Sequence, residues 1–525
     1  MQPRHQLNVP LPIILTLLAL VSLLVSIPAF PATYVVDPAG DDANAGGAAA
    51  PWRTIQHAAS RAVAGDRVVI RAGTYVESVY LSHSGTAAQP IIFAAQPGAV
   101  LVSPNPDASF EALNVAPGVA YITVTGIEAT GGFDETIFLR SGAHDIQLQD
   151  CNLHHNHAGI IAGGAYNVTV TGCALHDNSG VGMRLVGDTR NVLVTDTDSF
   201  MNGDGATCSS VVDGFAIGPQ PIGVAFVRAR AYDNGGDGFD LKGDQITLED
   251  IESSGNACTG IKLWANASVK RCLVTGNSRG FAVTSLPGDT TVDVMNCTVA
   301  DNDGVGMDLS GFVPRHPYTA RLRNSIIAGA HKAIQYQSAQ VLSEAYNIFY
   351  RPDPRGAVLA PVRRRRFTGS DINRGLWARR SHQGEGTLAV DPLFVDPANG
   401  DFHVQPTSAA VGRGFDDAGS AQGPGVPPNI GVYQEPVGPV NHSPWAVAGR
   451  DRKARAKRVL RFKAKGSFDP DGDRLSYAWD FGDGSDPVFG FKAKHRYAEP
   501  GVYVVRLSVS DGTLSGSTTS QATIR

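Results

Sequence analysis

A glycine-centred motif occurs three times between residues 212 and 263, as Val212–Ala216 (VDGFA), Gly236–Asp240 (GDGFD) and Thr259–Leu263 (TGIKL). The central glycines recur at intervals of 24 and 22 residues. Intervals of this size are typical of a solenoid in which each repeat forms one coil. Equivalent positions of the three segments are therefore expected to stack on neighbouring coils.

An asparagine marks the same repeat over a longer stretch. It precedes a run of glycine and apolar residues at seven positions: Asn156, Asn178, Asn202, Asn234, Asn256, Asn277 and Asn302. The widest gap contains an inserted loop, Gly203–Val212. Short β-branched runs such as Asn167–Thr171 lie between the asparagines, and no segment between them shows a helical period. This pattern predicts an all-β chain that forms a right-handed parallel β-helix, not a leucine-rich horseshoe. We expect structural asparagines, because Asn tolerates left-handed backbone geometry and hydrogen-bonds to its neighbours in a ladder.

Stacking also gathers charged side chains at one place. Parallel strands lie about 4.8 Å apart, which places Asp213 beside Asp237 and Asp240 beside Lys262. Carboxylates bind hard divalent cations, and a lysine beside such a cation is a candidate base. A single Asp in such a turn is more often a turn residue than a ligand, but the shared register of all four residues favours a catalytic site.

Composition and charge agree with an exported, rigid scaffold. The chain has 525 residues, 59 of them glycine, which is enough for one long solenoid and a small second domain. A formal net charge of −5 argues against a nucleic-acid partner. Residues 1–32 are predicted to be a signal peptide, because they begin with basic residues, continue with an apolar run at 11–27 and end with small residues up to Ala32. The protein would then be secreted, with no membrane contact after cleavage. An uncleaved membrane anchor is the alternative. We expect the secreted protein to be a monomer.

Six cysteines raise the question of disulfides in an exported protein. Cys208 lies in the inserted loop and Cys258 in a turn. We predict one disulfide between these two, which would fix the loop before Asp213. The other four each precede a ladder asparagine by five residues and are expected to be buried thiols: Cys151, Cys173, Cys272 and Cys297.

The segments that flank the coils suggest caps and a linker. Thr54–Val63 has apolar residues at helical spacing and is predicted to be a helix that covers the open end of the solenoid. Asp391–Tyr433 is predicted to close the other end, and the Pro- and Gly-rich stretch Gly423–Pro444 to be a linker. These features place a β-helix domain at residues 33–436 and a second domain at 437–525.

The second domain alternates strand and turn signals, as a small β-sandwich does. Its segments Ser467–Asp473 (SFDPDGD), Trp479–Gly484 (WDFGDG) and His495–Tyr503 closely resemble the polycystic kidney disease (PKD) domain. The resemblance implies a non-catalytic immunoglobulin-like module that serves as a spacer or surface-binding unit. We expect it to be an independent folding unit.

The coils also resemble an enzyme family. Asp213–Ala216 (DGFA), Ala231–Asp240 (AYDNGGDGFD) and Gly260–Leu263 (GIKL) look like the calcium and base motifs of pectate lyases of polysaccharide lyase family nine. The opening stretch Thr33–Tyr75 is similar to the N-terminal cap of that family. The likeness spans most of residues 33–436 and implies a parallel β-helix that cleaves an acidic polysaccharide.

Carried over residue by residue, the resemblance implies a Ca²⁺ site and a base. Asp213, Asp237 and Asp240 match the calcium ligands, and Lys262 matches the catalytic base. One position departs from the pattern, because Gly236 stands where the family has an aspartate. The calcium site would therefore have one carboxylate fewer.

Further polar residues fall at related positions. Arg279 shares the register of Asp213, and Arg184 that of Lys262. Either arginine can hold a substrate carboxylate by bidentate hydrogen bonds, although exposed structural arginines are commoner. Four histidines on earlier coils lack a carboxylate partner in register and are interpreted as a ladder that lines a turn: His154, His155, His157 and His176.

The chemistry of β-elimination explains why these residue types belong together. Cleavage of a 4-linked uronan begins with removal of the proton α to the sugar carboxylate, whose charge a bound cation neutralises. Lysine takes that proton only when its own pKa is lowered. The sequence thus favours a calcium-dependent lyase on pectate or another uronan.

Two other function classes stay open. One is a glycoside hydrolase, or an alginate-type lyase or epimerase, on the same scaffold. A hydrolase needs two facing carboxylates and gives Lys262 no role. The other is a non-catalytic carbohydrate-binding or adhesin protein.

Overall fold

The computed structural model describes residues 31–105, 111–203, 208, 211–284, 290–311, 318–329, 332–336, 341–351, 357–361, 366–405, 407–415, 428–434, 444–467, 469 and 474–525. The signal peptide predicted at residues 1–32 lies almost wholly outside this part of the chain, as does most of the predicted linker Gly423–Pro444. Within it, no helix is both long and apolar enough to cross a membrane.

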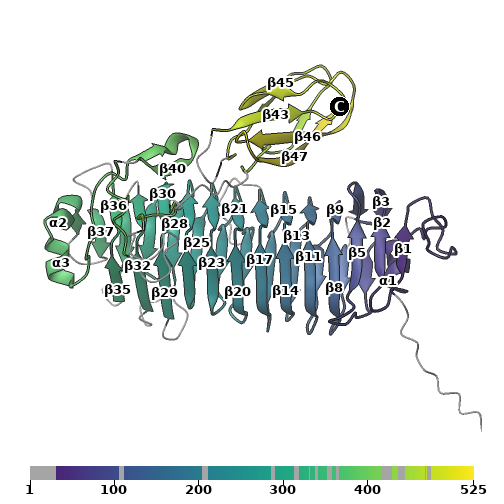
Figure 1. Ribbon diagram of the computed structural model, residues 1–525, viewed down its shortest axis with the longest axis horizontal. Helices are drawn as coiled ribbons and strands as arrows, with labels where there is room; N and C mark the ends of the chain where they lie inside the picture. The colour runs from purple at the N-terminus through teal and green to yellow at the C-terminus, as the bar shows by residue number, and fades with distance from the viewer. Residues whose placement is uncertain are drawn as a thin grey trace, which may run out of the picture.

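Three long sheets of short parallel strands form a β-helix in the described residues (Figure 1). The first sheet contains β1 (Thr33–Val36), β2 (Arg67–Ile70), β5 (Ile91–Ala95), β8 (Ala120–Thr125), β11 (His144–Gln149), β14 (Tyr166–Thr171), β17 (Arg190–Thr195), β20 (Ile222–Val227), β23 (Ile246–Glu249), β26 (Ala267–Lys270), β29 (Thr290–Met295), β32 (Tyr318–Arg323) and β35 (Val341–Ala345). The second sheet contains β4 (Val79–Leu81), β7 (Leu113–Val115), β10 (Glu135–Leu139), β13 (Ala158–Gly163), β16 (Met183–Val186), β19 (Phe215–Ile217), β22 (Phe239–Leu241), β25 (Thr259–Leu263), β28 (Arg279–Val283), β31 (Val305–Leu309), β34 (Lys332–Tyr336), β37 (Ala357–Pro361) and the antiparallel β38 (Phe367–Thr368). The third sheet contains β3 (Gly73–Val76), β6 (Ala99–Val102), β9 (Glu128–Thr130), β12 (Asn152–His154), β15 (Ala174–His176), β18 (Asp198–Phe200), β21 (Arg230–Tyr232), β24 (Glu252–Ser254), β27 (Leu273–Thr275), β30 (Thr298–Asn302), β33 (Ile326–Gly329) and β36 (Ile348–Tyr350).

A continuous apolar core fills the inside of the coils. Side chains alternate along each strand, so one face of every sheet points inward. Phe215 and Phe239 stack there on neighbouring coils, with ring centroids 5.0 Å apart. The four ladder cysteines are buried free thiols, as the sequence predicts.

Buried asparagines tie successive coils together at the turn between the third and second sheets. The Asn256 side-chain nitrogen donates to the Asn277 side-chain oxygen at 2.9 Å and to the Ala231 carbonyl at 2.9 Å. The Asn256 side-chain oxygen in turn accepts from the backbone nitrogen of Asn234 at 3.1 Å. Each ladder residue thus satisfies polar groups that burial would otherwise leave unpaired.

One expectation about these asparagines is wrong. Positive backbone angles fall on the residue before each of them, with φ between 50° and 66°: His155, Asp177, Met201, Asp233, Gly255, Gly276 and Asp301. The asparagines are therefore selected for their hydrogen bonds, and the preceding residue carries the left-handed bend.

Short helices lie near the two ends of the coils. Helix α1 (Ile55–Ala59) forms inside the predicted segment Thr54–Val63 but is shorter, and its role as a cap stays a prediction. Helices α2 (Gly369–Asn373) and α3 (Leu376–Ser381) follow β38. The last helix and strands described before the second domain are β39 (Phe394–Asp396), the 3₁₀ helix η1 (Pro397–Asn399) and β40 (Asp401–Val404).

The C-terminal domain has its own sheets and core. A five-stranded sheet joins β41 (Arg452–Ala454), β47 (Ser515–Ile524), β46 (Gly501–Ser510), β43 (Ser476–Asp480) and β44 (Val488–Phe489). A second sheet pairs β42 (Leu460–Lys463) with β45 (Lys492–His495). Trp479, Phe481 and Phe462 are buried between the two sheets.

Replacement of one ladder asparagine should destabilise the whole β-helix. We expect Asn256→Ala to lower the free energy of unfolding by about 2 to 4 kcal/mol, because it leaves buried partners on two neighbouring coils unpaired. The exposed Gln147 offers a matched control, and Gln147→Ala should change stability by less than about 0.5 kcal/mol. Urea unfolding of both variants measures the difference. Equal stability of the two would contradict a structural ladder.

Candidate active site

The aspartates singled out by the motif lie at the start of the second-sheet strands. Asp213 directly precedes the Gly214 that leads into β19, and the backbone nitrogen of Asp237 donates to its carboxylate at 2.8 Å. Asp237 lies one coil further, and its own carboxylate accepts from the backbone nitrogen of Thr259 at 2.7 Å. Each carboxylate is thus held by the turn of the next coil. All three aspartates are buried, with exposed fractions of 2% for Asp213, 3% for Asp237 and 2% for Asp240.

Strand pairing brings the lysine to the same place. Asp240 in β22 is the direct register partner of Lys262 in β25. The Lys262 ammonium nitrogen lies 3.0 Å from an Asp237 carboxylate oxygen and 3.8 Å from one of Asp240. The structure therefore gathers Asp237, Asp240 and Lys262 into one ion-paired cluster, with Asp213 bonded to its edge.

Two members of this cluster were missed by the sequence analysis. Lys242 forms a close ion pair with Asp240. The Trp264 ring nitrogen donates to the other Asp240 oxygen at 2.7 Å, and both lysine ammonium groups lie 5.3 Å from a Trp264 ring centroid. Each residue follows Asp240 or Lys262 by two positions. Strand alternation, which places such residues on one face, was the signal that could have found them.

Burial and crowding of like charges shape the electrostatics. Desolvation, followed by repulsion from Asp237, raises the pKa of Asp213 to about 7. Burial lowers the pKa of Lys262, but the carboxylates of Asp237 and Asp240 outweigh it and raise that pKa above its ordinary value. The cluster therefore holds Lys262 as a cation.

The two arginines predicted to bind substrate lie on the second sheet, on other coils than the ion-paired cluster. Arg184 occupies the same row as Asp240, with Ala216 between them. Arg279 is the register partner of Thr259, and its guanidinium lies 3.9 Å from Asp308. Neither arginine belongs to the ion-paired cluster itself.

A disulfide braces the turn beside the cluster. The structure joins Cys208 of the inserted loop to Cys258, the residue before Thr259. The backbone nitrogen of Cys258 also donates to the carbonyl of Gly236 at 3.0 Å. The bridge thus fixes the loop next to Gly236 and Asp237.

The donor set suits a hard divalent cation in its chemistry. Buried carboxylates of Asp213, Asp237 and Asp240 supply oxygen ligands of the type that calcium prefers. The cations at Asp237 and Asp240 in this structure are the ammonium groups of Lys262 and Lys242. A metal would therefore have to take the place of these lysines.

The earlier histidine ladder is partly as predicted. The rings of His154 and His176 stack at 4.9 Å on neighbouring coils. As expected, no carboxylate is the register partner of His154 or His176, but carboxylates outside that register do contact them: Glu128 lies 3.1 Å from His154 and Asp177 lies 2.9 Å from His176. His155 pairs at 3.3 Å with a residue of the C-terminal domain, Asp451, which no repeat of the β-helix could reveal.

A known family of β-helix proteins matches the part of the chain that forms these coils. Residues 34–311, more than half of the chain, match the family described as Pel9A-like, right handed beta helix region. The chain belongs to this family. Residues 441–525 match the PKD domain. Both resemblances noted in the sequence are confirmed, and the Pel9A-like region includes every residue of the cluster.

Curated relatives of this Pel9A-like protein include two lyases. It is 29% identical over 220 residues to pectate lyase PEL9 of Emericella nidulans, covering 40% of this chain and 51% of that protein. It is 27% identical over 263 residues to pectate lyase L of Dickeya chrysanthemi, covering 47% and 54%. The chain spans about half the length of these relatives. The crystal structure of pectate lyase Pel9A is 19% identical, with a TM-score of 0.47, and the match covers 77% of this chain and 96% of that one.

Charge crowding at Asp213 predicts a pH-dependent effect on stability. A folded-state pKa raised to about 7 means that this carboxylate destabilises the fold increasingly as pH rises from about 4 to above 7. In the presence of a chelator, Asp213→Asn should therefore unfold at a higher temperature than the wild type at pH 8. The difference should shrink at pH 5, where Asp213 is mostly protonated. Thermal unfolding at both pH values measures this, and a variant that is less stable at pH 8 would contradict the crowding.

Proposed function

We propose that the protein is a secreted, calcium-dependent polysaccharide lyase that cleaves pectate or a related uronan by β-elimination. The observation that carries the proposal is the Lys262 ammonium held between Asp237 and Asp240 in coils that match the Pel9A-like family. The two curated relatives are named as pectate lyases, which makes pectate the first substrate to test. We further propose that the protein acts as a monomer.

Lys262 is the group that we assign as base. It would take the proton α to the substrate carboxylate, after which the bond to the leaving sugar breaks and a carbon–carbon double bond forms. A charged lysine cannot accept this proton, and Asp237 and Asp240 favour its charged form. Neutralisation of those carboxylates would leave burial as the dominant influence and lower the pKa of Lys262.

Asp213, Asp237 and Asp240 are the residues that would hold calcium. Bound there, it would supply the positive charge that stabilises the substrate carboxylate as the proton leaves. The same carboxylates would then no longer favour a charged Lys262. Metal binding and base activation are therefore coupled through residues that already touch one another.

The remaining cations suit the binding of an acidic chain. Lys242 directly follows β22, the strand that contains Asp240, and release from this ion pair would leave its ammonium able to contact a sugar carboxylate. Arg184 lies on the same row two coils before Asp240. Arg279 lies one coil beyond Lys262, in the row of Thr259 and three residues before Ala282, the register partner of Lys262. An extended uronan laid across the coils would meet these charges in turn.

A glycoside hydrolase fits the cluster less well. Hydrolysis requires one carboxylic acid and one carboxylate facing each other across the bond. Asp237 and Asp240 instead contact lysine ammonium groups. A non-catalytic adhesin would have no use for a lysine held between two buried carboxylates.

The direct test is an assay of the purified protein on polygalacturonate, alginate and a neutral polysaccharide. We expect absorbance from unsaturated products on a uronan, abolished by a chelator and restored by calcium. New reducing ends without that absorbance would indicate a hydrolase and overturn the proposal. No cleavage of any polymer would favour a binding protein.

Removal of the proposed base should abolish turnover. We expect Lys262→Ala to lower kcat by about 10² to 10⁴, the range typical of general base catalysis, while the fold and substrate binding persist. The exposed Lys270 on the first sheet is a matched control, and Lys270→Ala should retain full activity. Steady-state kinetics of both variants provides the measurement. Wild-type turnover in Lys262→Ala would exclude this residue as the base.

A carboxylate restored at position 236 should tighten calcium binding. Gly236 lies beside Asp237 and is not among the described glycines with a positive φ, so an aspartate there would not be strained by a left-handed backbone. Gly236→Asp should reach half of its calcium-induced rise in unfolding temperature at a lower calcium concentration than the wild type. An unchanged midpoint in a folded variant would show that position 236 does not face the ion.

A further inference from the structure

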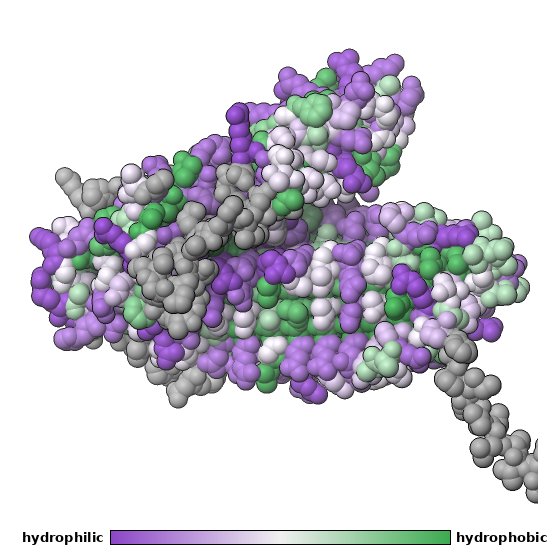
Figure 2. Space-filling view, in the orientation of Figure 1, coloured by the Kyte–Doolittle hydropathy of each residue, from purple (hydrophilic) through white to green (hydrophobic). Residues whose placement is uncertain are grey.

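The PKD domain packs against the third sheet of the β-helix, near β15 and β21 (Figures 1 and 2). Val447 joins Phe200, Met201 and Tyr232 in a small apolar cluster. The Arg230 guanidinium lies 3.4 Å from a ring centroid of Trp445. The contact is therefore a specific interface with its own packing.

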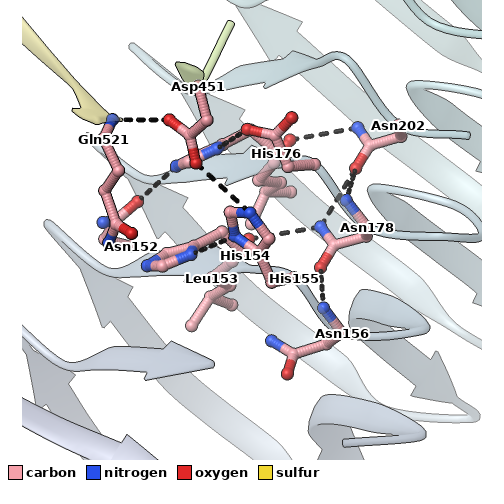
Figure 3. A network of polar contacts seen from close by, with 12 residues as sticks. Asn152, Leu153, His154, His155, Asn156, His176, Asn178, Asn202, Asp451 and Gln521 are labelled. Carbon is pink, nitrogen blue, oxygen red and sulfur yellow. Dashed lines mark hydrogen bonds and ion pairs between the residues drawn. The ribbon is translucent and has the colours of Figure 1, made fainter. Parts of the chain in front are cut away.

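Three ligand-bearing side chains meet at the edge of this interface (Figure 3). His155 and Asp177 come from the turns of two successive coils, and Asp451 comes from the start of the PKD domain. One nitrogen or oxygen atom of each lies within 4.8 Å of the other two. Within the described part of the chain, no other group of three or more His, Cys, Asp or Glu residues brings its ligand atoms this close together.

Hydrogen bonds orient the histidine with its Nε2 atom toward this point. The His154 Nε2 atom lies 3.1 Å from the Glu128 carboxylate, which can only accept, so His154 carries its proton there. The His154 Nδ1 atom of the neutral ring is then an acceptor for His155 Nδ1, 2.8 Å away. Asp451 is likewise an acceptor only, so without a metal His155 donates to it through Nε2, and this hydrogen bond raises the pKa of His155. A metal bound at Nε2 would take the place of that proton, while the Nδ1 proton keeps its bond to His154. This is the arrangement that fixes a metal-binding imidazole in proteins.

The two carboxylates are oriented in the same way. Asp451 accepts from the backbone nitrogen of Gln521 at 2.5 Å through one oxygen and turns the other toward His155 (Figure 3). Asp177 accepts from His176 at 2.9 Å. Both His155 and Asp177 occupy left-handed backbone positions, with φ of 56° and 51°, so the turns themselves hold these residues in place.

The spacing of His155 and Asp451 fits two ligands of a shared metal ion. His155 Nε2 lies 3.3 Å from the Asp451 oxygen. Charge-assisted hydrogen bonds are shorter, about 2.8 Å, whereas two ligands that each lie about 2.0 to 2.1 Å from a tetrahedral zinc are about 3.3 to 3.4 Å apart. Two carboxylates and a neutral imidazole would also balance the charge of a divalent cation.

We propose that His155, Asp177 and Asp451 form a binding site for a divalent transition metal such as zinc, which links the PKD domain to the β-helix. One nitrogen and two oxygen ligands suit zinc, and they distinguish this site from the all-carboxylate set of Asp213, Asp237 and Asp240. Because the ligands belong to both domains, metal binding stabilises their docked arrangement.

Titration calorimetry with zinc, on the chelator-treated protein carrying both domains and in calcium-containing buffer, tests the site. We expect one zinc ion per chain. His155→Gln and Asp451→Asn should each weaken binding by at least about ten-fold. His157 offers a matched control, since it is exposed and bonds to Ser179 outside the cluster, so His157→Gln should bind zinc as the wild type does. Circular dichroism confirms that each variant is folded.

A second measurement reports the link between the domains. Zinc should slow proteolytic cleavage between residues 434 and 444 in the wild type but not in Asp451→Asn. The absence of stoichiometric binding at micromolar zinc would show that the cluster is an ion pair only and overturn the proposal. Unchanged binding in both His155→Gln and Asp451→Asn would overturn it equally, since the zinc would then lie elsewhere.

Discussion

Parallel pairing between coils is the interaction on which the rest of this structure depends. It turns a separation of about one repeat along the sequence into direct contact, so that Asp240 and Lys262 become register partners. The buried asparagine ladder keeps the coils in step at the turn that leads into the second sheet. Asn234 and Asn256 lie three residues before Asp237 and Thr259, so the ladder positions the turn that holds the candidate site.

In the candidate site, the negative charges of buried carboxylates are partly offset by the positive charges of lysines. Burial, followed by repulsion from the aspartates of the next coil, raises the pKa of Asp213. Lys262 and Lys242 offset part of that repulsion by ion pairing with Asp237 and Asp240. A divalent cation would offset it more strongly, and the same change would release the proposed base. Stability, the proposed metal binding and the proposed catalysis would thus depend on one set of charges.

Much of this could be predicted from the sequence, because the repeat fixes the register. The interval between Asp240 and Lys262 alone brings these residues together. Lys242 and Trp264 required the further step of following strand alternation by two residues. Asp451 could not have been found this way, since its contact with His155 joins domains with unrelated repeats. The left-handed bend also fell one residue before the asparagines, because the Asn side chain is occupied by hydrogen bonds to other coils.

In this account, Asp237 and Asp240 keep Lys262 charged until a metal cation takes the place of its ammonium group beside them. NMR titration of the Lys262 side chain, with and without calcium, measures this directly. Without calcium, the pKa of Lys262 should lie above its ordinary value. With calcium, it should fall below that value, because burial and the positive charge of the ion both disfavour the charged lysine. A pKa that does not change when calcium binds would contradict the account.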